Sequence, residues 1–195
     1  MIDTVIFPGL VYELMARQFG CHLDGPNGDL ETGWILMGTR HDNMAMVHGI
    51  FPSAGAEDSG YRHFHFDNEH MAKVIAANDR QRQALMGHVL GIAHSHPPGP
   101  GQSQPSGLDY EADIGWIKDL VNEEGIFGIV WDQRKGYRAG RFAMPSNMHL
   151  RPFEINMFAL ATGDPQYRPV HLIREELSCQ NDMKLSETNS SSNKE

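Results

Sequence analysis

The sequence LGIAHSHP, residues 90–97, ends an apolar run on two histidines that lie two positions apart. We expect the run to form a buried strand over Val89–Ala93 that delivers both histidines. Alternate residues of a strand point to the same face, so His94 and His96 project together while Ser95 points the other way. An H-x-H pair by itself is also typical of a plain strand edge. Its meaning therefore depends on what the rest of the chain brings to it.

A loop rich in glycine and proline follows and leads to the sequence SGLD, residues 106–109. Ser106 is well placed to cap a helix, because apolar residues recur downstream at helical spacing. Asp109 then lies in the first turn, where it can act as a metal ligand or simply complement the helix dipole. Two imidazoles and one carboxylate make a three-ligand site with an open fourth position, as in catalytic zinc centres; structural zinc sites use four protein ligands. The apolar residues of the expected helix are Tyr110, Ile114, Ile117 and Val121.

A second short apolar strand begins at a glutamate, in the sequence ETGWILMG of residues 31–38. A polar turn at Arg40–Asn43 and another apolar run at Met44–Phe51 follow it, which predicts a hairpin over residues 33–51. Glu31 by itself is typical of a solvated residue at a strand start. A catalytic metal centre also needs an acidic residue to take a proton from the metal-bound water, and Glu31 is a candidate for this role.

Together these residues resemble the signature of the JAMM metalloproteases, which have the MPN (JAB) fold. That signature is a glutamate opening an E-x-G-x-L-x-G-like strand, then H-S/T-H-P, and then S-x-x-D. The loop of nine residues between His96 and Ser106 is longer than is usual in the family. The resemblance covers Thr4–Met144. The residues on the signature positions are Glu31, His94, Ser95, His96, Pro97, Ser106 and Asp109.

The resemblance implies an α/β (α+β) fold of the MPN/JAB type, cytidine-deaminase-like, with a mixed, curved sheet flanked by helices on both sides. It also implies one zinc ion per chain, held by His94, His96 and Asp109, and hydrolysis of an amide by a water at the metal. Glu31 would take the proton of that water and pass it to the leaving amine. Ser106 would donate a hydrogen bond to the oxyanion that develops.

Active members of the family cleave the amide bond after the C-terminal glycine of ubiquitin or a ubiquitin-like protein, and the resemblance implies the same isopeptidase or peptidase activity here. The compact chain is similar to small prokaryotic-type members, some of which work beside E1-like and E2-like proteins. A ubiquitin-like tail can enter as an added strand beside a sheet edge. We expect Trp34 and the loop Pro52–Gly60 to line its path.

Three alternatives stay open at this point. A catalytically silent MPN scaffold would bind partners without turnover, although such members typically lack a motif residue. A zinc hydrolase of another small amide substrate would use the same side chains. A separate metal site is offered by His63, His65 and Glu69, which match part of a cupin pattern. The sequence contains neither the P-C-x-x-C of zinc deaminases nor the H-E-x-x-H of gluzincin proteases.

The chain of 195 residues suits one domain, expected over residues 1–177, followed by a disordered tail at 178–195 that is poor in apolar residues. A formal charge of −9 argues against nucleic-acid binding, and no apolar run is long enough to span a membrane. Cys21 and Cys179 are isolated, so we expect no disulfide framework and a cytoplasmic location. Further strands are expected at residues 4–7, 62–66 and 126–131, and further helices over 10–19 and from Asp67.

Overall fold

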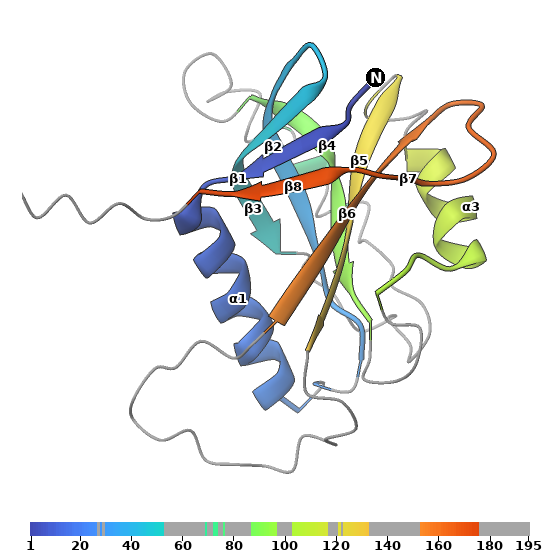
Figure 1. Ribbon diagram of the computed structural model, residues 1–195. Helices are drawn as coiled ribbons and strands as arrows, with labels where there is room; N and C mark the ends of the chain where they lie inside the picture. The colour runs from blue at the N-terminus through green and yellow to red at the C-terminus, as the bar shows by residue number, and fades with distance from the viewer. Residues whose placement is uncertain are drawn as a thin grey trace, which may run out of the picture.

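The computed structural model describes residues 1–26, 28, 30–52, 69, 72–73, 76, 87–96, 103–116, 121, 123–132 and 153–175. Within these ranges the chain is a mixed α+β molecule that is mostly sheet (Figure 1). Its elements are β1 (Thr4–Phe7), α1 (Gly9–Asp24), β2 (Gly33–His41), β3 (Met44–Pro52), β4 (His88–Ser95), α3 (Gly107–Trp116), β5 (Glu124–Asp132), β6 (Phe153–Ala161), β7 (Arg168–Pro169) and β8 (His171–Arg174). The expected α+β class is confirmed at this level.

The eight strands form one sheet in the order β7-β6-β5-β4-β2-β3-β1-β8. β4 pairs with β5, and β1 with β3 and β8, in parallel; the other pairs are antiparallel. The two end strands, β7 and β8, are separated in the chain by Val170 alone. The Val170 N–H donates to Met157 of β6, and the next N–H, of His171, donates to Asp3 beside β1. The chain thus joins the two ends of the sheet, which makes it a nearly closed, barrel-like sheet.

The two helices with defined bounds cover opposite faces of the sheet. Ala93 and Ile126 belong to the large core that α1 completes, whereas their chain neighbours Ile92 and Phe127 belong to a smaller cluster under α3. Because successive residues of a strand point to opposite faces, α1 and α3 must lie on opposite sides. Figure 1 shows this arrangement, with α1 in blue and α3 in yellow-green on different sides of the strands.

The hairpin expected over residues 33–51 is present as β2 and β3, joined by a tight turn at Asp42 and Asn43. Asp42 has a positive φ of 52°, a conformation that aspartate tolerates better than most residues. The first helix is longer than expected and begins and ends at Gly9 and Asp24. Its buried residues include Val11, Met15 and Phe19, whereas Leu10 and Leu14 are 68% and 42% exposed.

Strand β4 reaches the candidate site only after a local irregularity. Leu36 and Met37 of β2 pair with Gly91 and Val89, so Leu90 is an extra residue in β4. A Cβ on Gly91 would lie 1.7 Å from the carbonyl oxygen of Ile126, which explains a glycine at this close approach to β5. The bulge sets the register, and therefore the facing, of the two histidines that follow.

Strands β6, β7 and β8 were not expected from the sequence. β6 pairs with β5 over its whole length, from Glu124 opposite Ala161 to Asp132 opposite Phe153. The sheet therefore extends well past Met144, where the family resemblance ends. The expected strand at 62–66, most of the helix expected from Asp67, and the tail at 178–195 lie outside the described residues.

No helix in the described part of the chain is both long enough and apolar enough to cross a membrane.

Candidate metal centre

The end of β4 brings both histidines to the α3 side of the sheet. His94 lies two residues after Ile92, which packs under α3, so the two side chains share that face. His96 follows the last residue of β4, and its N–H donates to the carbonyl oxygen of Val130 at 2.9 Å. This bond continues the parallel ladder with β5 and keeps His96 in strand-like register. Both histidines are largely buried, with 7% and 12% of their side chains exposed.

Helix α3 supplies the third side chain through its N-terminal cap. The Ser106 N–H donates to Asp109 Oδ2 at 2.5 Å, and the Asp109 N–H donates to Ser106 Oγ at 3.2 Å. This reciprocal pair is a capping box, with aspartate in the position usually held by glutamate or glutamine. The cap expected at Ser106 is thus confirmed. It fixes the Asp109 carboxylate at the start of α3, facing the histidines.

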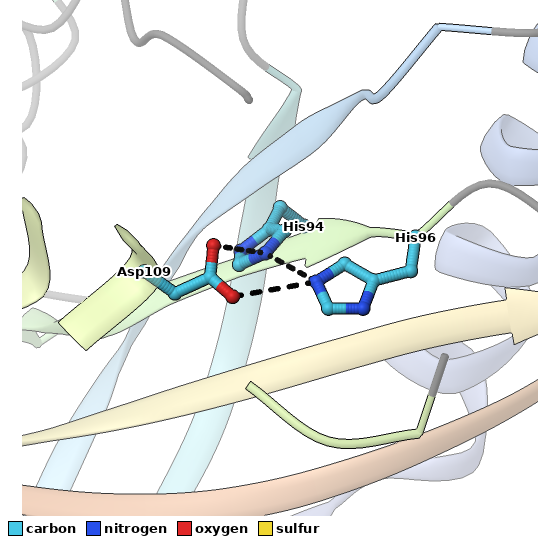
Figure 2. A group of neighbouring side chains, drawn as sticks. All are labelled: His94, His96 and Asp109. Atoms are coloured by element: carbon cyan, nitrogen blue, oxygen red, sulfur yellow. Dashed lines mark hydrogen bonds and ion pairs between the residues drawn. The ribbon is translucent and has the colours of Figure 1, made fainter. Parts of the chain in front are cut away.

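Figure 2 shows the three side chains pointing toward one another from β4 and α3. His94 Nε2 and His96 Nε2 are 3.1 Å apart, and the Asp109 oxygens lie 3.3 Å from His94 Nε2 and 3.5 Å from His96 Nε2. In a tetrahedral site with bonds of about 2.0–2.1 Å, neighbouring ligand atoms are roughly 3.3–3.4 Å apart. The three side chains therefore have the spacing to hold one metal ion.

The electrostatics of Asp109 favour a charged ligand. Burial alone would raise its pKa, but hydrogen bonds from His94, His96 and the Ser106 N–H together outweigh burial and hold the pKa of Asp109 well below its usual range. The carboxylate is therefore ionised at any pH near neutrality. An anionic oxygen beside two imidazole nitrogens is a common ligand set for catalytic zinc.

Glu31 lies beside this centre without belonging to the cluster of three. It lies two residues before Gly33, the first residue of β2. Gly33 pairs with His94, so strand parity places Glu31 on the same face as His94. Glu31 is 4% exposed, and its Oε2 has no hydrogen-bond partner among the described residues. Burial raises the pKa of Glu31 to about 7; the charge of His96 opposes this shift and that of Asp109 adds to it. A buried carboxyl with this pKa can both accept and release a proton near neutral pH.

Ser106 is exposed at the edge of the centre. Its hydroxyl oxygen accepts the Asp109 N–H, and a hydroxyl that accepts in this way keeps its own proton to donate. Capping α3 and donating to a substrate are therefore compatible uses of the same side chain.

The expectation that Trp34 lines a substrate path is wrong. Trp34 is 1% exposed and belongs to the core on the α1 side, opposite the face that carries His94. Its indole N–H donates to Gln18 of α1 at 2.8 Å, and its ring meets Phe19 edge-on. The remainder of the expected path, residues 53–60, lies outside the described residues.

The competing cupin-like site is described only at Glu69, since His63 and His65 lie outside the described residues. Glu69 is exposed and pairs with Lys73 Nζ at 2.7 Å. This ion pair has the spacing of one helical turn and is typical of a solvated helix face.

Two polar contacts around the centre were missed in the sequence. Asp113, one helical turn after Asp109, is 3% exposed and accepts a hydrogen bond from the Tyr167 hydroxyl at 2.5 Å. Asn156 of β6 donates to the carbonyl oxygen of Ser103 at 2.9 Å, which ties the end of the long loop to the sheet. The spacing of one helical turn between Asp109 and Asp113 could have indicated that Asp113 lies near the centre. Tyr167 and Asn156 could not have been found in this way, because no helix or strand was expected from the sequence in their part of the chain.

No protein-family model matches the sequence, and no curated protein matches it. Among solved structures, the chain is similar to protein DSY2949 from Desulfitobacterium hafniense, whose structure was determined in solution. The TM-score is 0.55 at 18% sequence identity, and the match covers 88% of this chain and 93% of that one. This is a likeness of fold. It agrees with the mixed α+β architecture and says nothing of activity.

Proposed function

We propose that this protein is a zinc-dependent isopeptidase or peptidase of the JAMM type. The observation that carries the proposal is the convergence of His94, His96 and Asp109 at metal-ligand spacing. The buried carboxyl of Glu31 is close enough for the charges of His96 and Asp109 to act on its pKa. The sheet with α1 on one face and α3 on the other supports assigning the MPN fold as well.

The donor set favours zinc among the common metals. Two imidazole nitrogens and one carboxylate oxygen suit zinc, whereas magnesium and calcium take oxygen ligands almost alone. His94, His96 and Asp109 would hold the zinc ion as three protein ligands. A zinc ion bound by them would lower the pKa of a water molecule and polarise a carbonyl oxygen.

Glu31 carries the proton. Its pKa near 7 allows it to take a proton from the attacking water and to deliver that proton to the leaving amine. Ser106, at the open edge of the centre, donates a hydrogen bond to the oxygen that becomes negative as the carbonyl is attacked. The products are a carboxylate and an amine, and the reaction needs no covalent intermediate.

The substrate class rests on the family resemblance. The amide after the C-terminal glycine of ubiquitin or a ubiquitin-like protein is the proposed substrate, and E1-like and E2-like proteins of the same pathway are the proposed partners. A catalytically silent scaffold is less well supported, because all the motif side chains required for chemistry are present and lie on one face.

The proposal is tested by mass spectrometry of products. Zinc-loaded protein is mixed with a panel of fusions in which ubiquitin or a ubiquitin-like protein is followed by a short peptide. We expect cleavage after the C-terminal glycine of at least one fusion, and loss of that cleavage in Glu31→Gln. Hydrolysis of small amides but of no fusion would show that the substrate is a small amide and not a ubiquitin-like protein. Hydrolysis of neither would contradict the proposed enzymatic activity and favour the catalytically silent scaffold.

A further inference from the structure

The position of Glu31 is set by the backbone on either side of it, outside β2. The carbonyl oxygen of Leu30 accepts a hydrogen bond from His22 Nε2 of α1 at 2.9 Å. On the other side, the N–H and the carbonyl oxygen of Thr32 both form hydrogen bonds with Ser95 of β4. The peptide units that flank Glu31 are thus tied to two different elements, and mainly its side-chain torsions are left to aim the carboxyl.

The bonds between Thr32 and Ser95 depart from a regular ladder. In a hydrogen-bonded antiparallel pair, the two opposed residues exchange two N–H···O=C bonds. Here the Ser95 N–H donates to the Thr32 carbonyl at 2.7 Å, as expected, but the Thr32 N–H donates to the Ser95 hydroxyl at 2.9 Å. A side chain has replaced a backbone carbonyl, and β2 begins only at the next residue, Gly33. The hydroxyl therefore shapes the point where the chain leaves the sheet and carries Glu31.

Ser95 is suited to this role because it lies between the two histidines and faces the other way. It is 2% exposed and is directed toward the side of the sheet that α1 covers, so it is not available as a nucleophile at the metal. The end of β4 thereby places His94 and His96 on one face. Through Ser95, which points to the opposite face, it also places Glu31 beside them.

We propose that Ser95 is a positioning residue for Glu31, acting through its hydroxyl on the Thr32 N–H, and that His22 supports it from the other side through Leu30. This inference rests on the proposed function for its effect on rate. Its structural part, the hold on the backbone at Thr32, stands independently.

The experiment compares Ser95→Ala, Ser95→Thr and Glu31→Gln, together with the double variant Ser95→Ala/Glu31→Gln. The probe is ubiquitin carrying a fluorescent amine on its C-terminal glycine. We expect Ser95→Ala to bind one zinc as wild type does, to lower kcat roughly 10- to 100-fold, and to change KM little. Ser95→Thr keeps a hydroxyl and should recover most of the rate. When Glu31 is already changed to Gln, adding Ser95→Ala should lower kcat by less than about a further twofold, because Ser95 acts through Glu31.

Amide hydrogen exchange gives a readout that needs no turnover. Exchange at the Thr32 N–H should accelerate about tenfold or more in Ser95→Ala, remain near the wild-type rate in Ser95→Thr, and be unaffected by Glu31→Gln. His22→Leu, a change in α1 and not in β4, is a second variant for the case in which Ser95→Ala does not fold. It should lower kcat with zinc retained, and the loss should again vanish in the Glu31→Gln background.

Unchanged Thr32 exchange in Ser95→Ala would overturn the inference whatever the activity. Loss of zinc in that variant, or additive losses with Glu31→Gln, would overturn it too, since Ser95 would then act on the ligands rather than on Glu31. If wild type does not cleave the probe while Thr32 exchange responds as expected, the substrate is wrong and the hold on Glu31 stands.

Discussion

Glu31 and Asp109 are two carboxyl groups beside the same histidines, and their surroundings move their pKa values in opposite directions. Burial raises that of Glu31 to about 7, whereas hydrogen bonds from His94 and His96 keep that of Asp109 low against its burial. Pairs of acids separated in this way mark a division of work: one group carries a proton and the other stays charged. In the proposed function, this contrast is the reason for taking Asp109 as the ligand and Glu31 as the proton carrier, and not the reverse.

Glu31→Gln tests this division at the level of one atom. Glutamine has nearly the same shape but cannot accept the proton, so we expect full zinc binding and a loss of roughly 10²–10⁴ in rate. Glu111→Gln, an exposed residue of α3, is the matched control and should turn over as wild type does. Unchanged turnover in Glu31→Gln would remove Glu31 from the mechanism, and loss of zinc would make it a ligand.

At the scale of elements, α3 is held in place by a buried pair. Tyr167 lies among the aromatic rings of Tyr110, Phe127 and Phe158 and donates to Asp113. Burial raises the pKa of Asp113 to about 8; the Tyr167 hydrogen bond opposes this, and the charge of Asp109 adds to it. The helix that presents Asp109 is thus anchored by a carboxyl group that stays protonated at neutral pH.

This anchor predicts a pH dependence of stability. Between about pH 4 and 8 the native Asp113 keeps its proton while the unfolded chain has lost it. Its contribution is therefore fully present below about pH 4 and is lost as the pH rises to about 8. We expect the free energy of unfolding of wild type, relative to Asp113→Asn, to fall over this window with a slope of at most about 1.4 kcal/mol per pH unit. Urea unfolding in the presence of a chelator measures it, and a flat difference would refute the raised pKa.

The elements around the site were predictable to different degrees. The histidines were placed on one face because strand parity is a local property, and Ser106 was placed as a cap because the helix signal follows it directly. β6 was missed because only Ile155 and two phenylalanines among its nine residues are typical strand formers. Its strand character comes from pairing with β5, a partner distant in the sequence. The facing of Trp34 was missed because β2 is buried on both sides, and a continuous apolar run does not reveal which face meets which helix.

At the scale of the whole molecule, one buried carboxylate connects segments that are far apart in the chain. Glu124, at the start of β5, is 5% exposed and accepts from Arg40 of β2 at 2.8 Å and from the Ile2 N–H at 2.9 Å. It also pairs with Arg168 of β7, which in turn pairs with Asp164. The network ties the two ends of the nearly closed sheet to its middle. It lies at the start of β5, whereas His94 pairs with Ile129 near the other end of that strand.

Removing this carboxylate should loosen the sheet without touching the centre. Glu124→Ala leaves both arginines without their shared partner, and we expect a loss of about 3 kcal/mol in the free energy of unfolding. Glu123→Ala, at an exposed neighbouring position, is the control and should stay within about 0.5 kcal/mol of wild type. Zinc content should be the same in all three proteins when folded. A change below about 1 kcal/mol in Glu124→Ala would show that the network contributes little.

The proposed function requires His94, His96 and Asp109 to hold one zinc ion. Elemental analysis of zinc-loaded, gel-filtered protein tests it directly. We predict one zinc per chain in wild type, nearly none in His96→Ala and Asp109→Ala, and one in His48→Ala, a strand histidine that instead contacts the Thr39 hydroxyl at 2.8 Å. No zinc in wild type would contradict the account. Full zinc retention in His96→Ala would do so as well, and would direct attention to His63, His65 and Glu69.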